Sequence, residues 1–414
     1  MKKRSRSLTV VAGVAAIVLT ISACASDKSS SSSGGSGSSS GTIKVGVVLP
    51  FSGVQATIAG LEGQGVQTAI DEINAKGGIK GQKLEMVKAD DQLSATQAAT
   101  VMRDLNSKGV KLAVGGQTSD LCKAEAQAAN RFGIIFIGAH CTSKTLVNPP
   151  VSPNFWMTGQ LDTDLTRANG QALAALFPNV QTWDVFAYDQ SVTRGFWTQT
   201  RDEISKVTGK EVVTNKEVYV PATATDFKTQ LSAIASSQTG TKETRGLFLG
   251  VYGAGTTSFI QQARPLGLLD DYAVMAQTGV YWSTAVSLKG TAPPIYDVHE
   301  YFYSCQNNPT NTAFIADFKK VAGQLPDTGA YQGYMAIEML SAAIAKAGSG
   351  DPTAVGKAMP GISAMTPTGE TMTMDGTSHH ADGPITTALL SGDTSAPENV
   401  SVTDCKTVLS SAIK

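Results

Sequence analysis

The sequence lacks the features that several common protein classes require. Its 414 residues carry a formal net charge of −1, with no sustained basic run, which argues against nucleic acid as a partner. It contains no Walker-type loop, no strand-following G-x-G-x-x-G and no H-E-x-x-H, so no phosphate-binding loop or zinc-protease helix is present. No motif supplies a catalytic nucleophile, and we predict that the protein is not an enzyme.

Ligand sets for metals are missing as well. There is no C-x-x-C, and the Cys and His residues do not have the spacing of zinc sites. The pair His379-His380 has no acidic or cysteine partner at ligand spacing. The sequence therefore predicts no metal site and no cofactor.

The N-terminus has the pattern of an export signal. A basic start at residues 2–6 precedes an apolar run from Leu8 to Ala23, and about 16 apolar residues are fewer than the roughly 20 that cross a bilayer. We interpret residues 1–23 as a lipoprotein signal peptide. Residues 19–24 (LTISAC) resemble a bacterial lipobox, in which the cysteine receives diacylglycerol, so Cys24 is the predicted lipid anchor.

A linker follows the predicted anchor and makes up the rest of residues 24–41. Every residue from Ser29 to Gly41 is Ser or Gly, a composition that remains a flexible coil with a reach on the order of 20 Å. We therefore expect an extracytoplasmic protein tethered to the outer face of the plasma membrane. The tether indicates a Gram-positive host.

Four further cysteines are an even number in an exported chain, which is typical of disulfides. They are Cys122, Cys141, Cys305 and Cys405. Three pairings are possible. We favour Cys122 with Cys141 and Cys305 with Cys405, because the first two flank a single helix-and-strand unit.

Beyond the linker, short β-rich apolar runs alternate with longer segments of helical period, as in βαβ units with parallel sheets. About 370 residues correspond to two domains, so we predict an α/β fold of two doubly wound parallel-sheet lobes. The predicted strands are 43–49, 84–89, 111–115, 134–137, 183–188, 211–220, 246–252, 273–276 and 371–374, and residues 298–303 are expected to form an extended crossing. The predicted helices are 61–75, 96–106, 122–132, 196–207, 227–235, 313–321 and 334–347.

Candidate binding residues lie in loops that follow predicted strands, where open sheets bind ligands and free N–H groups favour anions. Thr118 and Ser119 also have the pattern of helix N-caps, and the aromatic residues Tyr281 and Trp282 are equally explained by packing. The first-lobe candidates are Gln117, Thr118, Ser119, His140 and Thr142. The second-lobe candidates are Tyr252, Gln277, Thr278, Tyr281 and Trp282.

Three stretches carry a family likeness: residues 43–48 (IKVGVV), 51–53 (FSG) and 69–81 (AIDEINAKGGIKG). They resemble the Leu/Ile/Val-binding protein family, the type I periplasmic binding proteins of branched-chain amino acid ABC importers, and the likeness spans nearly all of residues 43–390. It implies two lobes joined by a three-crossover hinge near 187–189, 299–304 and 371–375. We expect residues 42–187 plus 304–372 in the N-terminal lobe, and 188–303 plus 373–414 in the C-terminal lobe.

The resemblance also implies roles for single residues. Ser119 and Thr142 stand where the family binds the ligand carboxylate, Ile58 stands where relatives place an aromatic residue, and a second-lobe tyrosine falls at Tyr252 or Gly253. Thr278 replaces the acid that accepts the ligand ammonium. Because an unpaired charge in a closed cleft is costly, an α-amino acid is not the safe choice of ligand.

These features predict a monomeric, lipid-anchored solute-binding protein of an ABC importer. We expect it to close on a small polar solute, which is an amino acid, a carboxylate or an amide, and to dock on ABC transporter permease subunits. The alternative is a ligand-sensing receptor subunit with the same fold. Since no signalling domain follows Lys414, such a receptor would act with a separate membrane partner.

Overall fold

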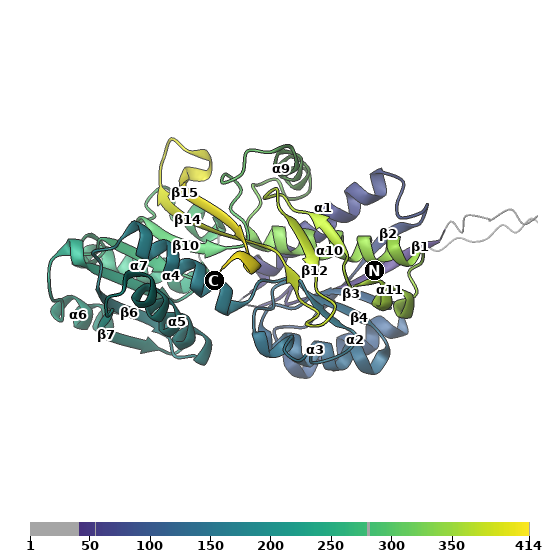
Figure 1. Cartoon of the computed structure of the whole chain (residues 1–414), viewed down its shortest axis with the longest axis horizontal. Coiled ribbons are helices and arrows are strands. Elements are labelled where there is room, and N and C mark those ends of the chain that lie inside the picture. The colour runs from purple at the N-terminus through teal and green to yellow at the C-terminus, as the bar shows by residue number, and fades with distance from the viewer. Residues whose placement is uncertain (1–40, 54, 280–281, 414) are drawn as a thin grey trace, which may run out of the picture. The chain divides into compact units, whose positions relative to one another are not determined.

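The computed structural model describes residues 41–53, 55–279 and 282–413. Its first sheet has five strands in the order β2-β1-β3-β4-β5 (Figure 1), and every neighbouring pair is parallel. The strands are β1 (Thr42–Leu49), β2 (Lys83–Asp90), β3 (Leu112–Gly115), β4 (Ile135–Gly138) and β5 (Phe155–Met157).

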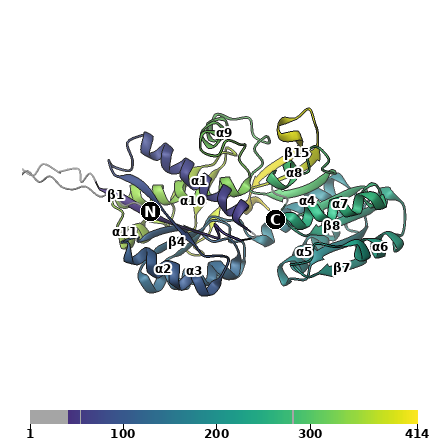
Figure 2. The same ribbon diagram turned by 180° about the vertical axis from the view of Figure 1, so that it is seen from behind.

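Helices cover both faces of this sheet, as Figure 2 also shows. Successive strand residues point to opposite faces: Val47 packs under α1 and α10, whereas its neighbour Val48 packs under α2 and α3. The helices on the Val47 face are α1 (Ala56–Ala75), α9 (Pro309–Ala322), α10 (Thr328–Ala347) and α11 (Pro352–Ala358). Those on the other face are α2 (Ala95–Ser107) and α3 (Ser119–Phe132).

The second sheet has seven strands in the order β15-β14-β10-β9-β8-β6-β7. Strands β6 to β10 are parallel, and β14 and β15 add an antiparallel edge. They are β6 (Thr182–Tyr188), β7 (Val213–Val220), β8 (Arg245–Gly250), β9 (Val274–Gln277), β10 (Ile295–His299), β14 (Pro384–Gly392) and β15 (Val400–Leu409).

This second sheet is also covered on both faces. On one face lie α4 (Asp162–Leu176) and α5 (Ser191–Thr208), and on the other lie α6 (Lys228–Ser236), α7 (Ala254–Ala263) and α8 (Trp282–Ser287). A third, small antiparallel sheet holds β11 (Ser363–Met365), β12 (Thr371–Met374) and β13 (Ala381–Asp382). The α/β fold with parallel-sheet lobes is therefore confirmed.

Several elements depart from the prediction. The extended crossing expected at 298–303 begins inside β10, which ends at His299, where the chain leaves the sheet. Helix α4 was not predicted, since Asn169 and Gly170 lie inside it and both lower helix propensity. Strands β5, β14 and β15 were also missed.

The structure corrects the predicted lobe boundaries. We expected residues 42–187 in the first lobe, but β6 pairs with β7 and β8 in the seven-stranded sheet, so the chain changes sheets between Met157 and Asp162. Residues 373–382 stay with the small sheet through β12 and β13. The second sheet is rejoined only at Pro384.

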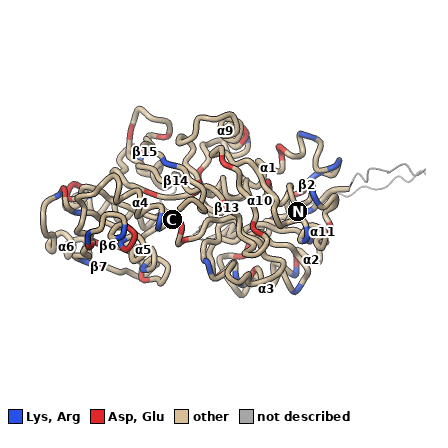
Figure 3. The backbone as a smooth tube through the Cα atoms, viewed as in Figure 1, with Lys and Arg blue, Asp and Glu red and all other residues tan. Residues whose placement is uncertain are grey.

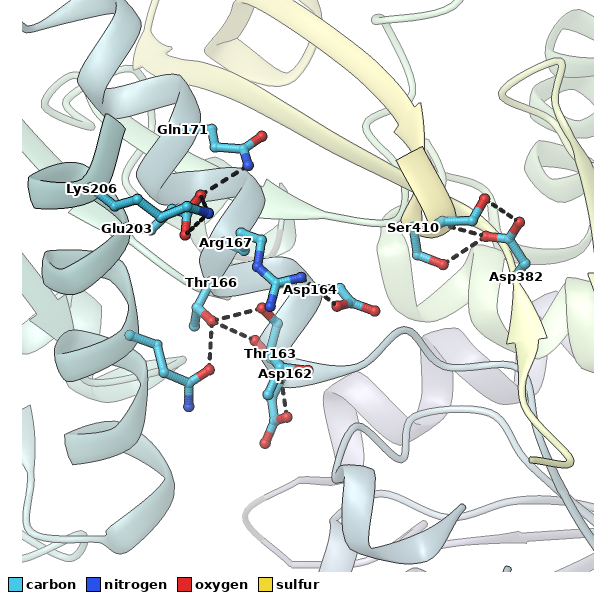
Figure 4. A network of polar contacts seen from close by, with 12 residues as sticks. Asp162, Thr163, Asp164, Thr166, Arg167, Gln171, Glu203, Lys206, Asp382 and Ser410 are labelled. Atoms are coloured by element: carbon cyan, nitrogen blue, oxygen red, sulfur yellow. Dashed lines mark hydrogen bonds and ion pairs between the residues drawn. The ribbon is translucent and has the colours of Figure 1, made fainter. Parts of the chain in front are cut away.

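Polar contacts surround two of these passages between the sheets (Figure 4). Where α4 packs on α5, Gln171 Nε2 donates to Glu203 Oε1 at 3.0 Å, and Lys206 pairs with the same carboxylate at 3.1 Å. Next to β14, Asp382 Oδ1 accepts the hydroxyl of Ser410 at 2.7 Å. The first group of contacts fixes α4 to α5 within the second lobe, and the bond to Asp382 holds the end of the last passage.

Both favoured disulfides are present. Cys122 of α3 is bonded to Cys141 in the loop after β4, and Cys305, ahead of α9, is bonded to Cys405 of β15. The first bond joins the loops that follow two adjacent strands of the first sheet. The second ties the end of the chain to a segment 100 residues earlier.

Helices α1 and α10 cross with their backbones in direct contact, and two glycines make this possible. A Cβ atom on Gly65 would lie 1.9 Å from the carbonyl oxygen of Ala330, and one on Gly333 would lie 2.1 Å from that of Glu62. Any larger residue would therefore push the two helices apart.

We expect Gly65→Ala to lower the free energy of unfolding by about 2 kcal/mol or more, because overpacking at the crossing outweighs the better helix propensity of alanine. Gly60 of the same helix is the matched control, since a Cβ there meets nothing within 4 Å. Gly60→Ala should raise the free energy of unfolding by roughly 0.5–1 kcal/mol. Urea denaturation measures both, and equal effects would contradict the close crossing.

Candidate functional site

The loops after β3 and β4 meet at the carboxyl edge of the first sheet. Ser119 is the first residue of α3, and its Oγ accepts the backbone N–H groups of Thr142 at 3.3 Å and Ser143 at 3.1 Å. The Cys122–Cys141 disulfide joins the same two loops. Ser119 and Thr142 are thus neighbours, as the resemblance implied, and the O–H of Ser119 can still donate.

Gln117 and His140 come together beside them. Gln117 Nε2 lies 3.0 Å from Nδ1 of His140, and that nitrogen lies 3.8 Å from the carboxylate of Glu62 on α1. Ile58 stands one helical turn before Glu62, so the two share a face of α1. Thr118 is different: its exposed side chain caps α3 by accepting the N–H of Leu121.

In the second lobe, the loop after β9 lies beside the loop after β8. A Cβ atom on Gly279, whose φ is +109°, would lie 3.3 Å from the ring of Tyr252 and 3.6 Å from Nε2 of His299. Among the described residues, neither the buried hydroxyl of Tyr252 nor that of Thr278 has a hydrogen-bond partner. These two predicted residues therefore keep polar atoms available for a ligand.

Gln277 is placed differently from the other candidates. Its side-chain amide nitrogen donates to the carbonyl of Val251 and to Oγ1 of Thr256, and its backbone carbonyl accepts from the side chain of Asn169. The side chain thus links β9 to the start of α7 inside the second lobe. Tyr281, named as a candidate from the sequence, lies outside the described residues, as do residues 1–40 with the predicted signal peptide, Cys24 and most of the linker.

A narrow recess lies where segments of the two sheets adjoin. It is lined by the start of α8, by the passage that follows β10, and by the start of α10. The lining residues are Trp282, His299, Tyr301, Phe302, Tyr303, Pro326, Asp327 and Thr328. Of these, only Trp282 was a candidate from the sequence, and its ring packs edge-on against Tyr303 at 4.6 Å.

Glu300 is a buried carboxylate at the junction of the passages. It accepts hydrogen bonds from the backbone N–H of Gln160 at 3.1 Å, Gln332 Nε2 at 3.0 Å and Thr328 Oγ1 at 3.2 Å. Burial by itself would raise the pKa of Glu300, but the adjacent His299 and these donors lower it. Since Gln160 also donates to the carbonyl of Ala381, all three passages are hydrogen-bonded together.

Other buried acids were missed by sequence reasoning. Glu62, Asp91, Glu125 and Asp327 are each no more than 1% exposed, and burial raises the pKa of each. Acidic residues on helices and in turns normally face water, so the sequence gives no sign of their burial. Asp327-Thr328-Gly329 has the pattern of a helix start, which predicts a cap but not its burial.

Glu125 has a clear pH consequence. Burial, followed by the negative charge of Asp91, raises its pKa well above 4.5 in the folded protein. The folded state therefore holds a proton that the unfolded chain releases, and this lowers stability as the pH rises above about 4.5.

We expect Glu125→Gln to match the wild type near pH 4 and to be more stable than the wild type at pH 8. Glutamine is neutral at every pH, whereas the buried Glu125 must hold a proton that the unfolded chain has released. Urea unfolding at pH 4, 6 and 8 measures the difference. Glu85→Gln, at an exposed position of β2, is the control and should stay within about 0.5 kcal/mol of the wild type. A Glu125→Gln gain independent of pH would contradict the burial argument.

Figure 3 shows acidic and basic residues interspersed along the chain. In the described ranges, no group of three His, Cys, Asp or Glu side chains is arranged to hold a metal ion. No helix of the same ranges has the length and apolar character needed to cross a membrane.

Two parallel-sheet α/β units, three passages between them and polar loops at the strand ends define the class of two-lobed ligand-binding proteins. A family model described as "Periplasmic binding protein" matches residues 42–394. The chain belongs to this family, as a type I member of the Leu/Ile/Val-binding group. Its relatives are transport solute-binding proteins and not enzymes, and membership implies an extracytoplasmic location.

Curated relatives have related names. The chain is 25% identical over 330 residues to the leucine-, isoleucine-, valine-, threonine- and alanine-binding protein of Pseudomonas aeruginosa, covering 79% of this chain and 84% of that protein. It is 38% identical over 108 residues to the Leu/Ile/Val-binding protein of Escherichia coli, covering 25% and 28% of the two chains.

Solved structures show the same fold. A solute-binding protein of an ABC transporter from Rhodopseudomonas palustris, in complex with 3,4-dihydroxybenzoic acid, has a TM-score of 0.75 at 18% identity, over 89% of this chain and 98% of that one. The branched-chain amino acid transporter substrate-binding protein of Streptococcus pneumoniae, in complex with isoleucine, has a TM-score of 0.74 at 19% identity, over 89% and 99%.

Proposed function

We propose that this chain is a lipid-anchored, extracytoplasmic solute-binding protein of an ABC importer. It captures a small polar solute between its lobes and presents it to the permease subunits. The observation that carries the proposal is the joined pair of loops after β3 and β4, where Ser119 and Thr142 lie together beside a disulfide. The names of the curated relatives support the transport role.

The first-lobe loops suit a carboxylate or an amide. Ser119 begins α3, where free N–H groups and the helix dipole favour negative charge. Its hydroxyl proton and the hydroxyl of Thr142 add donors beside that helix end. Tyr252 and Thr278 supply buried hydroxyls from the second lobe, so the bound solute touches both lobes.

Closure follows from this division of contacts. A solute held by both lobes binds the closed state better than the open one, and only such a differential affinity shifts a conformational equilibrium. The passages at 158–161, at 300–308 and at Gly383, between β13 and β14, form the hinge in this proposal. The permease then recognises the closed conformation, which forms when a solute is bound.

The membrane arrangement is also part of the proposal. Cys24 carries the lipid, the Ser/Gly linker spaces the folded part from the outer face of a Gram-positive plasma membrane, and the protein acts as a monomer. The support is the signal-peptide and lipobox pattern of residues 1–24. Labelling with a radioactive fatty acid tests this point: the wild type should incorporate label, and Cys24→Ala should incorporate none.

The proposed motion predicts compaction on binding. A variant lacking residues 1–41 should bind one small solute from a panel of amino acids, benzoates and short amides in calorimetry. Small-angle scattering should then show a smaller radius of gyration at saturating solute. An unchanged radius with a calorimetrically confirmed solute would reject hinge closure.

The binding role of the first-lobe loops predicts the effect of removing both hydroxyls. Ser119→Ala with Thr142→Ala should raise the Kd of the confirmed solute by about 100-fold or more, since each hydrogen bond to a charged group contributes about 1.5–3 kcal/mol. The control is Thr198→Ala with Ser232→Ala, whose hydroxyls donate only to their own helices. Unchanged affinity in the first variant would place the site elsewhere.

A further inference from the structure

Exposed lysines gather at the edge of the first lobe where its parallel strands begin. Helices α1 and α10 end at this edge: the side chain of Asn74 in α1 bonds both backbone groups of Leu84 in β2, and a Cβ atom on Gly350 would lie 3.2 Å from Ile43 in β1. Lys83 Nζ donates to the backbone carbonyl of Asn74. We call this surface the basic edge, and its residues are Lys44, Lys76, Lys80, Lys83, Lys108 and Lys346, all exposed.

Further contacts join these lysines into one surface. Lys44 Nζ donates to the carbonyl of Lys108, the C-cap of α2, at 3.3 Å. A Cβ atom on Gly348, the C-cap of α10, would lie 3.1 Å from Nζ of Lys80. In Figure 3, basic segments lie around the N label at the start of β1. The ends of three helices and the starts of two strands therefore present their lysines together.

Few acids offset the charge of the basic edge. Glu72 pairs with Lys76 at 3.8 Å, and Glu85 stands opposite Lys44 in the register of β1 and β2. Asp351 is engaged as the N-cap of α11. The other four lysines of the basic edge form no ion pair among the described residues. This edge therefore keeps an excess of positive charge, although the whole chain carries a formal charge of −1.

Helix capping explains only part of this arrangement. A cation at the end of a helix interacts favourably with the helix dipole, which accounts for Lys76, Lys108 and Lys346. Lys80 lies in the turn between α1 and β2, and Lys83 is the first residue of β2. Their positive charges therefore need another explanation.

The matching edge of the second sheet has a different character. Helices α4 and α6 have no basic residue in their last turn, and the exposed residues near this edge include Leu176, Val207 and Val213. Lys210 and Lys242, ahead of β7 and β8, are each followed directly by a glutamate. The excess of lysine is thus a property of the first lobe and not of α/β topology in general.

The predicted linker joins the folded part at the basic edge. A Cβ atom on Gly41, the last linker residue, would lie 3.3 Å from Nε2 of Gln82, which stands between Lys80 and Lys83 in the sequence. A Ser/Gly linker with a reach on the order of 20 Å holds this edge close to the membrane. Tethering raises the effective concentration to about the millimolar range, so a weak attraction between the surfaces is sufficient.

We propose that the basic edge docks on the anionic lipid headgroups of the membrane that carries the protein, with phosphatidylglycerol as the type of partner. This inference rests on the proposed lipid anchor. Docking places the start of the first sheet against the lipid. The loops after β3 and β4 lie at the opposite edge of that sheet, so they face away from the membrane and stay open to the solute.

Vesicle flotation tests the docking without the anchor. The variant that lacks residues 1–41 keeps every described helix and strand, so it retains the basic edge and loses the lipid. It should float with vesicles of phosphatidylglycerol and phosphatidylcholine at millimolar lipid and low salt, and it should stay in solution with phosphatidylcholine alone. Adding Lys80→Gln, Lys83→Gln and Lys108→Gln should lower the partition coefficient by about 100-fold, since each lysine near an anionic surface contributes roughly fivefold.

The matched control removes the same charge from exposed positions of the second lobe, as Lys210→Gln, Lys228→Gln and Lys242→Gln. It should bind like the parent variant. An equal loss of binding in the two triple variants overturns the proposal, and so does a parent variant that does not float with anionic vesicles. Competition by soluble polyphosphate at an equal phosphate concentration would assign the surface to a soluble polyanion and overturn membrane docking.

Lysine acetylation, read by mass spectrometry, gives a second measurement that needs no lysine variant. The chain from Cys24 onward can be coupled to a maleimide lipid at that residue, because the other four cysteines form the two disulfides. On anionic vesicles, Lys80, Lys83 and Lys108 should react several-fold more slowly than on neutral vesicles, and Lys210 should react at the same rate on both. Equal rates for all four overturn the docking even if the triple variant fails to fold.

The two proposals can fail separately. If Cys24 incorporates no fatty acid but the variant without residues 1–41 floats with anionic vesicles, the lipid anchor is rejected and the lipid affinity of the basic edge stands. If the label is incorporated and neither flotation nor slower acetylation is observed, the anchor stands and the docking surface is rejected.

Discussion

The direct backbone contact between α1 and α10 is the constraint on which the rest of the structure depends. Gly65 and Gly333 allow it, because a side chain at either position would overlap a carbonyl oxygen of the other helix. This contact completes the first lobe with a helix from residues 328–347, far along the chain from β1. The chain must therefore leave the first lobe, build the second and return, and these passages form the junction between the lobes.

The same helix contact determines the electrostatics of the candidate site. It buries two acids, Glu62 of α1 and the cap residue Asp327 of α10, near the point where the two helices cross. Glu300 is also buried, but Gln160, Thr328 and Gln332 satisfy its oxygens, so it serves to hold the passages together. Glu62 lies beside His140, and Asp327 caps α10 through the N–H of Ala330.

Local signals predicted much of the first lobe. Ser119 and Thr142 lie together, as expected for loops after adjacent parallel strands at one edge of a sheet, and their binding role stays a prediction. The two disulfides paired as favoured. Helices were predicted less well where residues of low helix propensity interrupt the apolar pattern. Asn169 and Gly170 obscured α4, and without that helix β6 was placed in the wrong lobe. Thr118 and Gln277 fitted the loop pattern, but their side chains cap α3 and link β9 to α7.

By itself, the sequence determined the α/β fold class, the alternation of strands and helices, the even set of cysteines and the hydroxyls at the strand ends. These features depend on local periodicity and on residue chemistry, and both can be read directly from the order of the residues. The tertiary structure alone decided which acids lose contact with water, because burial depends on segments as distant as α1 and α10. Asp327 looks like an ordinary turn residue in the sequence, and only the packing of α10 beside the passage after β10 buries it.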